Sequence, residues 1–344
     1  MKRLLLAFVA IVLIGLGAGS WFYVSLHRPF KGYADAETYV EIPQGSGSKL
    51  MARRLADAGV VRSPTTFRIA VWLSGAGRRL QAGEYRFDRP MTPAEVVDKI
   101  ARGDVYLRPI TFREGLTIRE MASIFEEKGF GPASTFVEAA SQGARIHSFD
   151  PDARDLEGYL FPDTYALPRS ATADQLVARM IGQFERALTP ELRAGAAARG
   201  VSIRELVTLA SIVEKETGKP EERPLIAAVY TNRLKIGMGL QCDPTVIYAL
   251  ERAGRYNGNL TREDLKVDSP YNTYRYPGLP PGPIASPGLA SLEAAAHPAA
   301  VTYLYFVSRN DGSHAFATTL DEHNRNVQQY QVQYFRDKRR QSNH

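Results

Sequence analysis

The chain has 344 residues, of which 44% are hydrophobic and 23% charged, so it is long enough and apolar enough to bury a core. Its net charge of +6 is diffuse, and the basic tail at residues 336–344 lacks the interleaved aromatic residues of a nucleic-acid-binding segment. A single cysteine, Cys242, excludes an intramolecular disulfide, and the six histidines show no close pair at metal-ligand spacing. We therefore expect no nucleic-acid partner, no metal and no cofactor.

The N-terminal segment is predicted to be a membrane anchor. Residues 4–26 carry no formal charge, and 23 residues would extend about 34 Å as a helix, enough to cross a bilayer. A cleaved signal peptide has a shorter apolar core, whereas this run continues through three aromatic residues at 21–23, where an interfacial belt would lie. A retained transmembrane helix, residues 1–27, is therefore favoured over a signal peptide.

The next segment contains a pattern that occurs twice, in residues 38–107 and again in residues 108–190. Four residues recur at an offset of 70, namely Gly45, Met51, Ala52 and Gly59 as Gly115, Met121, Ala122 and Gly129. Each copy alternates as a strand, turns at a glycine, and then shows helical spacing that ends at another glycine. The sequence therefore predicts a duplicated β-turn-α unit.

The second copy differs from the first in its carboxylates. Where the first copy has Ala82 before a glycine, the second has Glu157, and it also gains Asp163. A carboxylate gained on a shared turn fits a binding site. A turn that simply needs capping explains it equally well, so both interpretations of Glu157 stay open.

Residues 191–335 show mostly helical patterns. Ser202 and Glu205 form a capping box, which predicts a helix that ends near Thr217 and is apolar nearly all round. Glu214 and Glu216 follow the apolar stretch, about 200° apart on the helix, so they cannot act side by side. One of them is expected to be functional.

Side-chain direction favours Glu214. It leans toward Ala210 and Ser211, whose small side chains leave space for a ligand, whereas Glu216 leans over larger residues. A glutamate in an apolar, half-buried setting has its neutral form favoured, as a general acid requires. The alternative is a structural glutamate bonded to an arginine such as Arg223 or Arg233.

Polar and aromatic residues follow this helix in two segments, and such residues suit a sugar-binding cleft. The candidate binding residues are Gln241, Asp243, Tyr271, Asn272, Thr273 and Tyr274. A rigid surface loop is the alternative for residues 271–288. Further on, residues 303–308 and the segment DGSHAFAT predict a β-hairpin, and a last helix begins near Leu320.

The segments ASIVEKET, LQCDPTVIY, YNTYRYPGLPPGPIASPG, AAAHP and YLYFV together resemble the endolytic murein transglycosylase family, called MltG or YceG-like. The resemblance implies an α+β fold with an N-terminal transmembrane helix, LysM-like β/α modules and a mostly helical catalytic region with a hairpin. The expected domains are the anchor at 1–27, a LysM-like module at 38–107, the catalytic region at 108–335 with its core at 191–335, and the tail at 336–344.

The resemblance also implies a reaction. The catalytic glutamate of the family maps to Glu214, Glu216 is then structural, and Tyr159 in the LEGY segment is a candidate for sugar stacking. The expected activity is cleavage of MurNAc-β-1,4-GlcNAc bonds within peptidoglycan strands, without water, to give 1,6-anhydroMurNAc ends. This would terminate or trim nascent strands beside peptidoglycan synthases, in a single-pass protein of the inner membrane with a periplasmic catalytic region.

Two other classes of protein remain as alternatives. A two-carboxylate muramidase would use Glu214 with Asp243 or Glu157. A non-catalytic scaffold would bind peptidoglycan through the repeat alone. The products formed from purified glycan strands separate these three possibilities.

Overall fold

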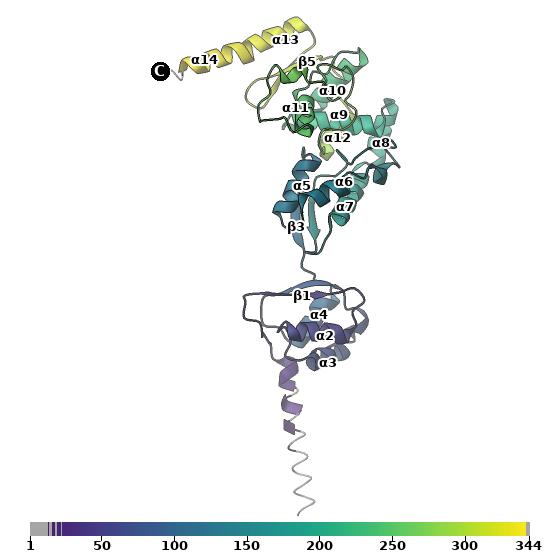
Figure 1. Cartoon of the computed structure of the whole chain (residues 1–344), viewed down its shortest axis with the longest axis vertical. Coiled ribbons are helices and arrows are strands. Elements are labelled where there is room, and N and C mark those ends of the chain that lie inside the picture. The colour runs from purple at the N-terminus through teal and green to yellow at the C-terminus, as the bar shows by residue number, and fades with distance from the viewer. Residues whose placement is uncertain (1–12, 14–15, 18, 22, 342–344) are drawn as a thin grey trace, which may run out of the picture. The chain divides into compact units, whose positions relative to one another are not determined.

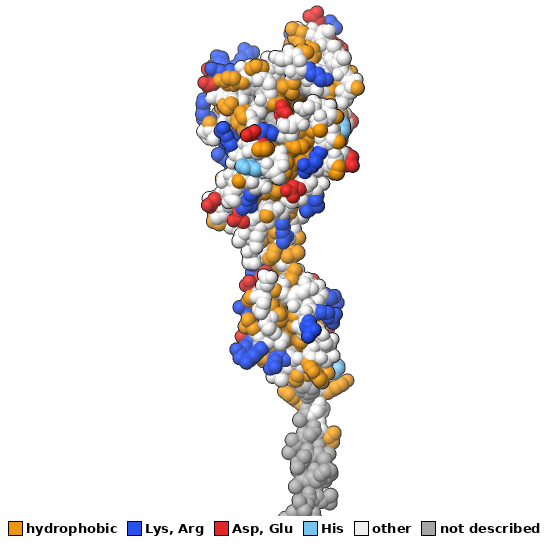
Figure 2. All heavy atoms as spheres, turned by 90° about the vertical axis from the view of Figure 1, so that its right-hand side faces the viewer, with side chains coloured by type: hydrophobic (Ala, Val, Ile, Leu, Met, Phe, Trp, Pro, Cys, Tyr) orange, Lys and Arg blue, Asp and Glu red, His pale blue; other side chains and the backbone are white. Residues whose placement is uncertain are grey.

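The computed structural model describes residues 13, 16–17, 19–21 and 23–341 of the chain (Figure 1). Its contacts divide the chain into two compact units. The first unit is Met1–Pro109 with Ala166–Ser170, and the second is Ile110–Tyr165 with Ala171–His344. Lys and Arg side chains are spread over the surface of both units, in keeping with the diffuse charge of the sequence (Figure 2).

The first unit folds around one antiparallel pair of strands. Strand β1 (Thr38–Ile42) pairs with β2 (Gly83–Phe87), and alternate residues of each strand are buried, as period-2 patterning requires. Three helices pack beside this pair: α2 (Ser48–Asp57), α3 (Pro64–Ser74) and α4 (Pro93–Ala101). Their apolar faces close one core with the strands, which includes Leu55, Phe67, Tyr85, Phe87, Val96 and Ile100.

The second copy of the repeat follows the same order of elements. It consists of β3 (Arg108–Thr111), α5 (Ile118–Glu127), α6 (Ala133–Ala140), β4 (Thr164–Leu167) and α7 (Ala173–Ala187), and β3 pairs with β4. The matched glycines have nearly equal φ angles: 77° at Gly45 and 78° at Gly115, and 68° at Gly59 and 69° at Gly129. Positive φ is readily adopted by glycine alone, which explains why these four positions match in sequence.

The remaining helices of the second unit gather around α9. They are α8 (Pro190–Ala198), α9 (Ile203–Glu216), α10 (Arg223–Lys235), α11 (Asp243–Arg252) and α12 (Leu289–Ala296). Helix α9 packs against α8, α10, α11 and α12, and its residues from Leu206 to Val213 are buried. The predicted helix therefore forms as a central buried element.

The C-terminal part contains the predicted hairpin. Strands β5 (Tyr305–Ser308) and β6 (His314–Ala317) are antiparallel, with Phe306 opposite Phe316. Helix α13 (Leu320–Val327), a π-helical turn (Gln328–Gln333) and helix α14 (Tyr334–Gln341) follow the hairpin.

The prediction of an N-terminal transmembrane helix is wrong for the residues that the structure describes. None of the helices among them is long and apolar enough to span a bilayer, and residues 1–12, 14–15, 18 and 22 of the predicted segment lie outside the described residues. A physical reason lies at the end of the segment. Leu26 belongs to the core of the first unit, so packing within the protein explains part of the apolar run.

Candidate active site

Helix α9 brings two glutamates to its last turn. At its start, the Ser202 hydroxyl accepts a hydrogen bond from the backbone N–H of Glu205, and the Glu205 carboxylate accepts one from the N–H of Ser202. This capping box satisfies free N–H groups of the first turn and fixes where the helix begins. Glu214 and Glu216 then lie on opposite sides of the other end of the helix, as the predicted angle requires.

Glu214 is bound by an arginine and a backbone amide. Arg223 Nη2 lies 3.3 Å from Glu214 Oε1, and the N–H of Gly288 donates to Glu214 Oε2 at 3.0 Å. The Glu214 side chain is only 6% exposed. The space expected over Ser211 is filled, since its hydroxyl accepts a hydrogen bond from the N–H of Ile284. The apolar, open setting inferred from the sequence is therefore absent, and the contact with Arg223 matches the structural alternative.

A further carboxylate, Glu114, lies beside this pair. Its Oε2 atom is 3.9 Å from Arg223 Nη2, so one guanidinium faces two carboxylates. Burial and, second, the charge of Glu214 raise the pKa of Glu114. Sequence reasoning missed Glu114, although the signal was present. The matching position of the first copy, 70 residues earlier, is Gln44, so Glu114 is another carboxylate gained by the second copy.

Glu216 has the surroundings of a general acid. The hydroxyl of Tyr230 donates to Glu216 Oε1 at 2.5 Å, and the thiol of Cys242 donates to the same oxygen at 3.1 Å. Burial raises the pKa of Glu216, and these two hydrogen bonds only partly oppose that rise. A carboxyl whose neutral form is favoured by desolvation is suited to donate a proton.

Three predicted binding residues gather beside Glu216. Gln241 and Asp243 flank Cys242 and are exposed, and the hydroxyl of Tyr274 donates to Asp243 Oδ1 at 2.6 Å. The charge of Asp243 contributes to the raised pKa of Glu216. The site therefore combines a buried acid with exposed amide, carboxylate and aromatic groups, which are the groups that bind sugars.

Two other predicted binding residues support the loop instead of lining a site. Asn272 is buried and donates to the carbonyl groups of Leu265 and Val267, while its side-chain oxygen accepts from the N–H of Tyr274. Thr273 is also buried, and its hydroxyl accepts from the N–H of Cys242 at 3.0 Å. Both residues thus hold Tyr274 and the segment around Cys242 in place.

Tyr271 lies with a different group of residues. Its ring is 4.9 Å from the ring of Tyr248, and it lines a cavity of about 940 Å³. A second cavity of about 540 Å³ shares three lining residues with the first: Asp155, Glu157 and Arg252. The structure therefore places Tyr271 next to two adjoining cavities, and Gln241, Asp243 and Tyr274 next to Glu216.

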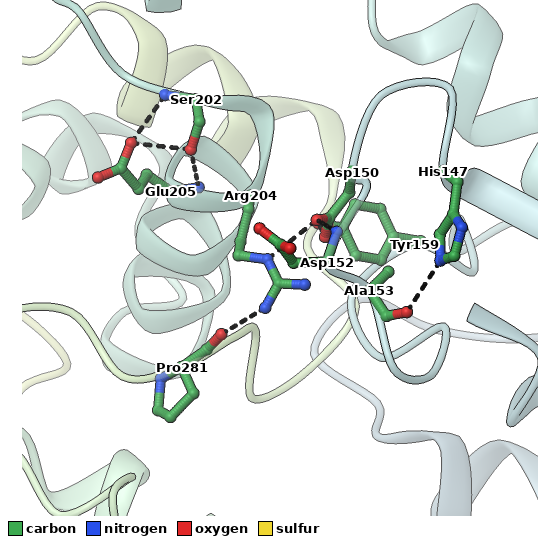
Figure 3. Close-up of polar contacts among 9 residues, drawn as sticks. All are labelled: His147, Asp150, Asp152, Ala153, Tyr159, Ser202, Arg204, Glu205 and Pro281. Atoms are coloured by element: carbon green, nitrogen blue, oxygen red, sulfur yellow. Dashed lines mark hydrogen bonds and ion pairs between the residues drawn. The ribbon is translucent and has the colours of Figure 1, made fainter. Parts of the chain in front are cut away.

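Glu157 and Tyr159 are buried and bonded within the protein. Glu157 accepts hydrogen bonds from the N–H of Ile118 and the hydroxyl of Tyr248, and burial raises its pKa to about 8. Tyr159 is 1% exposed and donates to Asp150, which Arg204 also contacts at 3.0 Å (Figure 3). The Tyr159 ring is packed in the protein, so stacking on a sugar would require this region to open.

The hairpin adds a contact between a carboxylate and a histidine that sequence reasoning missed. Glu222 accepts from both the N–H and the ring of His314, at 2.8 and 2.6 Å, and Thr217 next to Glu216 also donates to it. His314 is 92 residues from Glu222 in the sequence, and no local pattern joins the two. Among the described residues, no group of three or more His, Cys, Asp or Glu side chains is arranged to hold a metal ion.

The model of the YceG-like family matches residues 40–329 of the chain. An endolytic murein transglycosylase of Bacillus subtilis strain 168 is 32% identical over 331 residues, which cover 92% of this chain and 91% of the relative. An enzyme of the same name from Streptococcus pneumoniae strain D39 is 29% identical over 94% of this chain, which spans 64% of that longer protein.

A solved structure is also similar. The crystal structure of a yceG-like protein from Listeria monocytogenes aligns with a TM-score of 0.58 and 31% sequence identity. The alignment covers 84% of this chain and 98% of the Listeria chain. The similarity therefore extends over both copies of the repeat and the helical region around α9.

Proposed function

Because this chain belongs to the YceG-like family, we propose that it is an endolytic lytic transglycosylase that cleaves the glycan strands of peptidoglycan. The family match includes the last turn of α9 and the segments around Cys242 and Tyr274. The names of the relatives describe this class of reaction. The bond broken is the β-1,4 bond between MurNAc and GlcNAc inside a strand, and the product carries a 1,6-anhydroMurNAc end.

The geometry supports Glu216 as the acid and base of this reaction. The sequence resemblance maps the role to Glu214, which is ion-paired with Arg223 and covered by Gly288. Glu216 instead has a raised pKa and lies beside exposed polar residues. The observation that carries the proposal is this single buried acid next to Gln241 and Asp243.

The reaction needs one carboxyl group that acts twice. Protonated Glu216 donates its proton to the glycosidic oxygen as the bond from C1 of MurNAc to that oxygen breaks. The resulting carboxylate takes the proton of the 6-hydroxyl of the same MurNAc while that oxygen bonds to C1. Glu216 is then protonated again, and no water is consumed.

The exposed residues beside Glu216 are suited to hold the strand. The amide of Gln241 and the carboxylate of Asp243 hydrogen-bond sugar hydroxyls, and the ring of Tyr274 packs on apolar C–H surface. Because Asp243 is also a carboxylate, it is the candidate second group if the enzyme is a hydrolase. Glu157 is less suited to that role because Ile118 and Tyr248 already bind it.

Product analysis in ¹⁸O-water tests this proposal. Purified protein acting on glycan strands should give anhydro ends that carry no label, since the 6-hydroxyl is the nucleophile. Labelled reducing ends as the main product would mean that water attacks and that the enzyme is a muramidase. No turnover by well-folded protein would support the scaffold alternative.

We also propose that the protein works at the outer face of the cytoplasmic membrane, close to peptidoglycan synthases. The substrate lies there, and the net charge of +6 favours binding to anionic polymers and lipids. Protease added to spheroplasts should digest the region after Arg28. Full protection of that region would argue against this location.

A further inference from the structure

The first unit exposes an apolar turn at the end of helix α3. Trp72 is 78% exposed and Leu73 is 62% exposed, although both follow the buried residues Ala70 and Val71. Gly75 next to them is open as well, since a side chain added there would meet nothing within 4 Å. Large neighbouring apolar side chains left in water commonly mark a binding surface. We call Trp72, Leu73 and the exposed residues up to Arg79 the α3 patch.

Arginines flank the α3 patch. Arg68 lies one helical turn before Trp72, and Arg78 and Arg79 follow it. Residues 58–83 contain four arginines and no aspartate or glutamate. Arg68, Trp72 and Arg78 also line a shallow cavity of about 700 Å³. The surface of the first unit likewise shows apolar side chains with Lys and Arg on either side (Figure 2).

We propose that the α3 patch docks the first unit onto an anionic lipid surface. Trp and Leu side chains partition into the interface of a bilayer, and arginines beside them bind lipid phosphates. This inference rests on the proposed location at the membrane, and it concerns binding at the surface. The occupant is therefore a layer of anionic phospholipid headgroups, with the two apolar side chains at the level of the acyl boundary.

The chemistry of the patch favours lipid over a sugar strand. A sugar site sets amides or carboxylates beside an aromatic ring, as around Glu216, whereas the polar lining of this cavity consists of arginines, Ser48 and Thr65. The same unit carries a second group of exposed apolar residues, Trp21, Tyr23 and Val24, in the described part of the N-terminal helix. The residues just after that helix lie close to the segment before α3, since the N–H of Gly32 donates to the carbonyl of Gly59 and the guanidinium of Arg62 lies over the ring of Phe30.

Fluorescence quenching in the full-length chain tests this proposal. The sequence has two tryptophans, so Trp21→Phe leaves Trp72 as the single tryptophan, and Trp72→Phe provides the matched reporter for the N-terminal segment. Vesicles of phosphatidylglycerol with brominated acyl chains should quench Trp72 about twofold or more, and phosphatidylcholine vesicles much less. Arg78→Gln with Arg79→Gln should weaken the quenching in anionic vesicles, as should added salt.

Three outcomes would overturn the proposal. Trp72 that stays unquenched in anionic vesicles, while Trp21 is quenched, would show that the patch faces water. A Trp72 emission shift with glycan strands alone would identify a sugar site, and one with a purified synthase alone would identify a protein interface. Cleavage of soluble strands should be unchanged in Trp72→Phe, so loss of lipid binding is distinguishable from failure of the proposed enzyme activity.

Discussion

The two sides of the last turn of α9 carry the same functional group in different surroundings. On one side, Glu214 faces Arg223 and the backbone of Gly288, next to the second carboxylate Glu114. On the other, Glu216 faces the neutral donors Tyr230 and Cys242. A glutamate paired with a guanidinium ties helices together, whereas a buried glutamate among neutral groups can hold a proton. The environment therefore distinguishes the two side chains, and the residue type alone does not.

The largest expected effect separates these two sides directly. Glu216→Gln should lower turnover by about 10³-fold, because an amide keeps the size of the side chain but delivers no proton. Glu214→Gln is the matched control, and it should retain most of the activity of well-folded protein. Turnover of glycan strands by both variants is the measurement. Loss of activity in Glu214→Gln with activity kept in Glu216→Gln would restore the assignment made from sequence.

The next largest effect concerns the contribution of the Glu214–Arg223 pair to the stability of the protein. Arg223→Met should lower the free energy of unfolding by about 3 kcal/mol, because it leaves a buried carboxylate without its partner. Adding Glu214→Gln should recover part of the loss, since no unpaired charge then remains. Urea unfolding of the single and double variants measures this coupling. Equal losses in both would mean that the pair contributes through packing alone.

A third buried glutamate, Glu157, is predicted to make the stability of the protein depend on pH. Burial raises the pKa of Glu157 from 4.5 to about 8. At a pH between these two values, the folded protein therefore holds a proton on Glu157 that the unfolded protein has released. Its contribution to stability is complete below the unfolded value and is lost as pH rises toward 8. Between about pH 5.5 and about pH 7 the wild type should lose roughly 2 kcal/mol more than Glu157→Gln.

Unfolding free energies of both proteins at the two pH values test this effect. Glutamine can accept from Ile118 and still bond Tyr248, so the variant should fold. The same pH dependence in both proteins would mean that Glu157 is ionised in the folded state.

The smallest expected effect is a change in the pKa of Glu216. The hydroxyl of Tyr230 stabilises the Glu216 carboxylate and opposes the rise in its pKa. Tyr230→Phe removes that hydrogen bond, so the alkaline limb of the activity profile, where Glu216 loses its proton, should move up by less than about one pH unit. A limb that moves down, or does not move, would show that another group controls it.

Local patterns in the sequence predicted much of the architecture. The capping box at Ser202 begins α9, the matched glycines share positive φ, and the hairpin follows Tyr303. These features depend on neighbouring residues, so one sequence is enough to find them. The predicted transmembrane helix failed because hydropathy alone does not reveal that Leu26 packs in a core.

The site was harder to predict because its contacts join distant segments. The surroundings of the two glutamates depend on Arg223 and Tyr230 of α10, on Cys242 just before α11, and on Gly288 just before α12. The helical angle placed the two glutamates on opposite sides of α9, but side-chain direction favoured Glu214 and could not show which side would meet an arginine. Tyr159 was hard to predict for a similar reason, since its hydrogen-bond partner Asp150 lies nine residues earlier and no local pattern joins the two.

The hydrogen bond from Cys242 to Glu216 also has a use in labelling the protein. The thiol is buried, and this burial raises its pKa well above the usual value. Maleimides and iodoacetamides react with the thiolate, so the native cysteine should stay unmodified in the folded enzyme. A cysteine introduced on the α3 patch can then carry a spin label or a fluorophore at a single position, with the native thiol left in the active site.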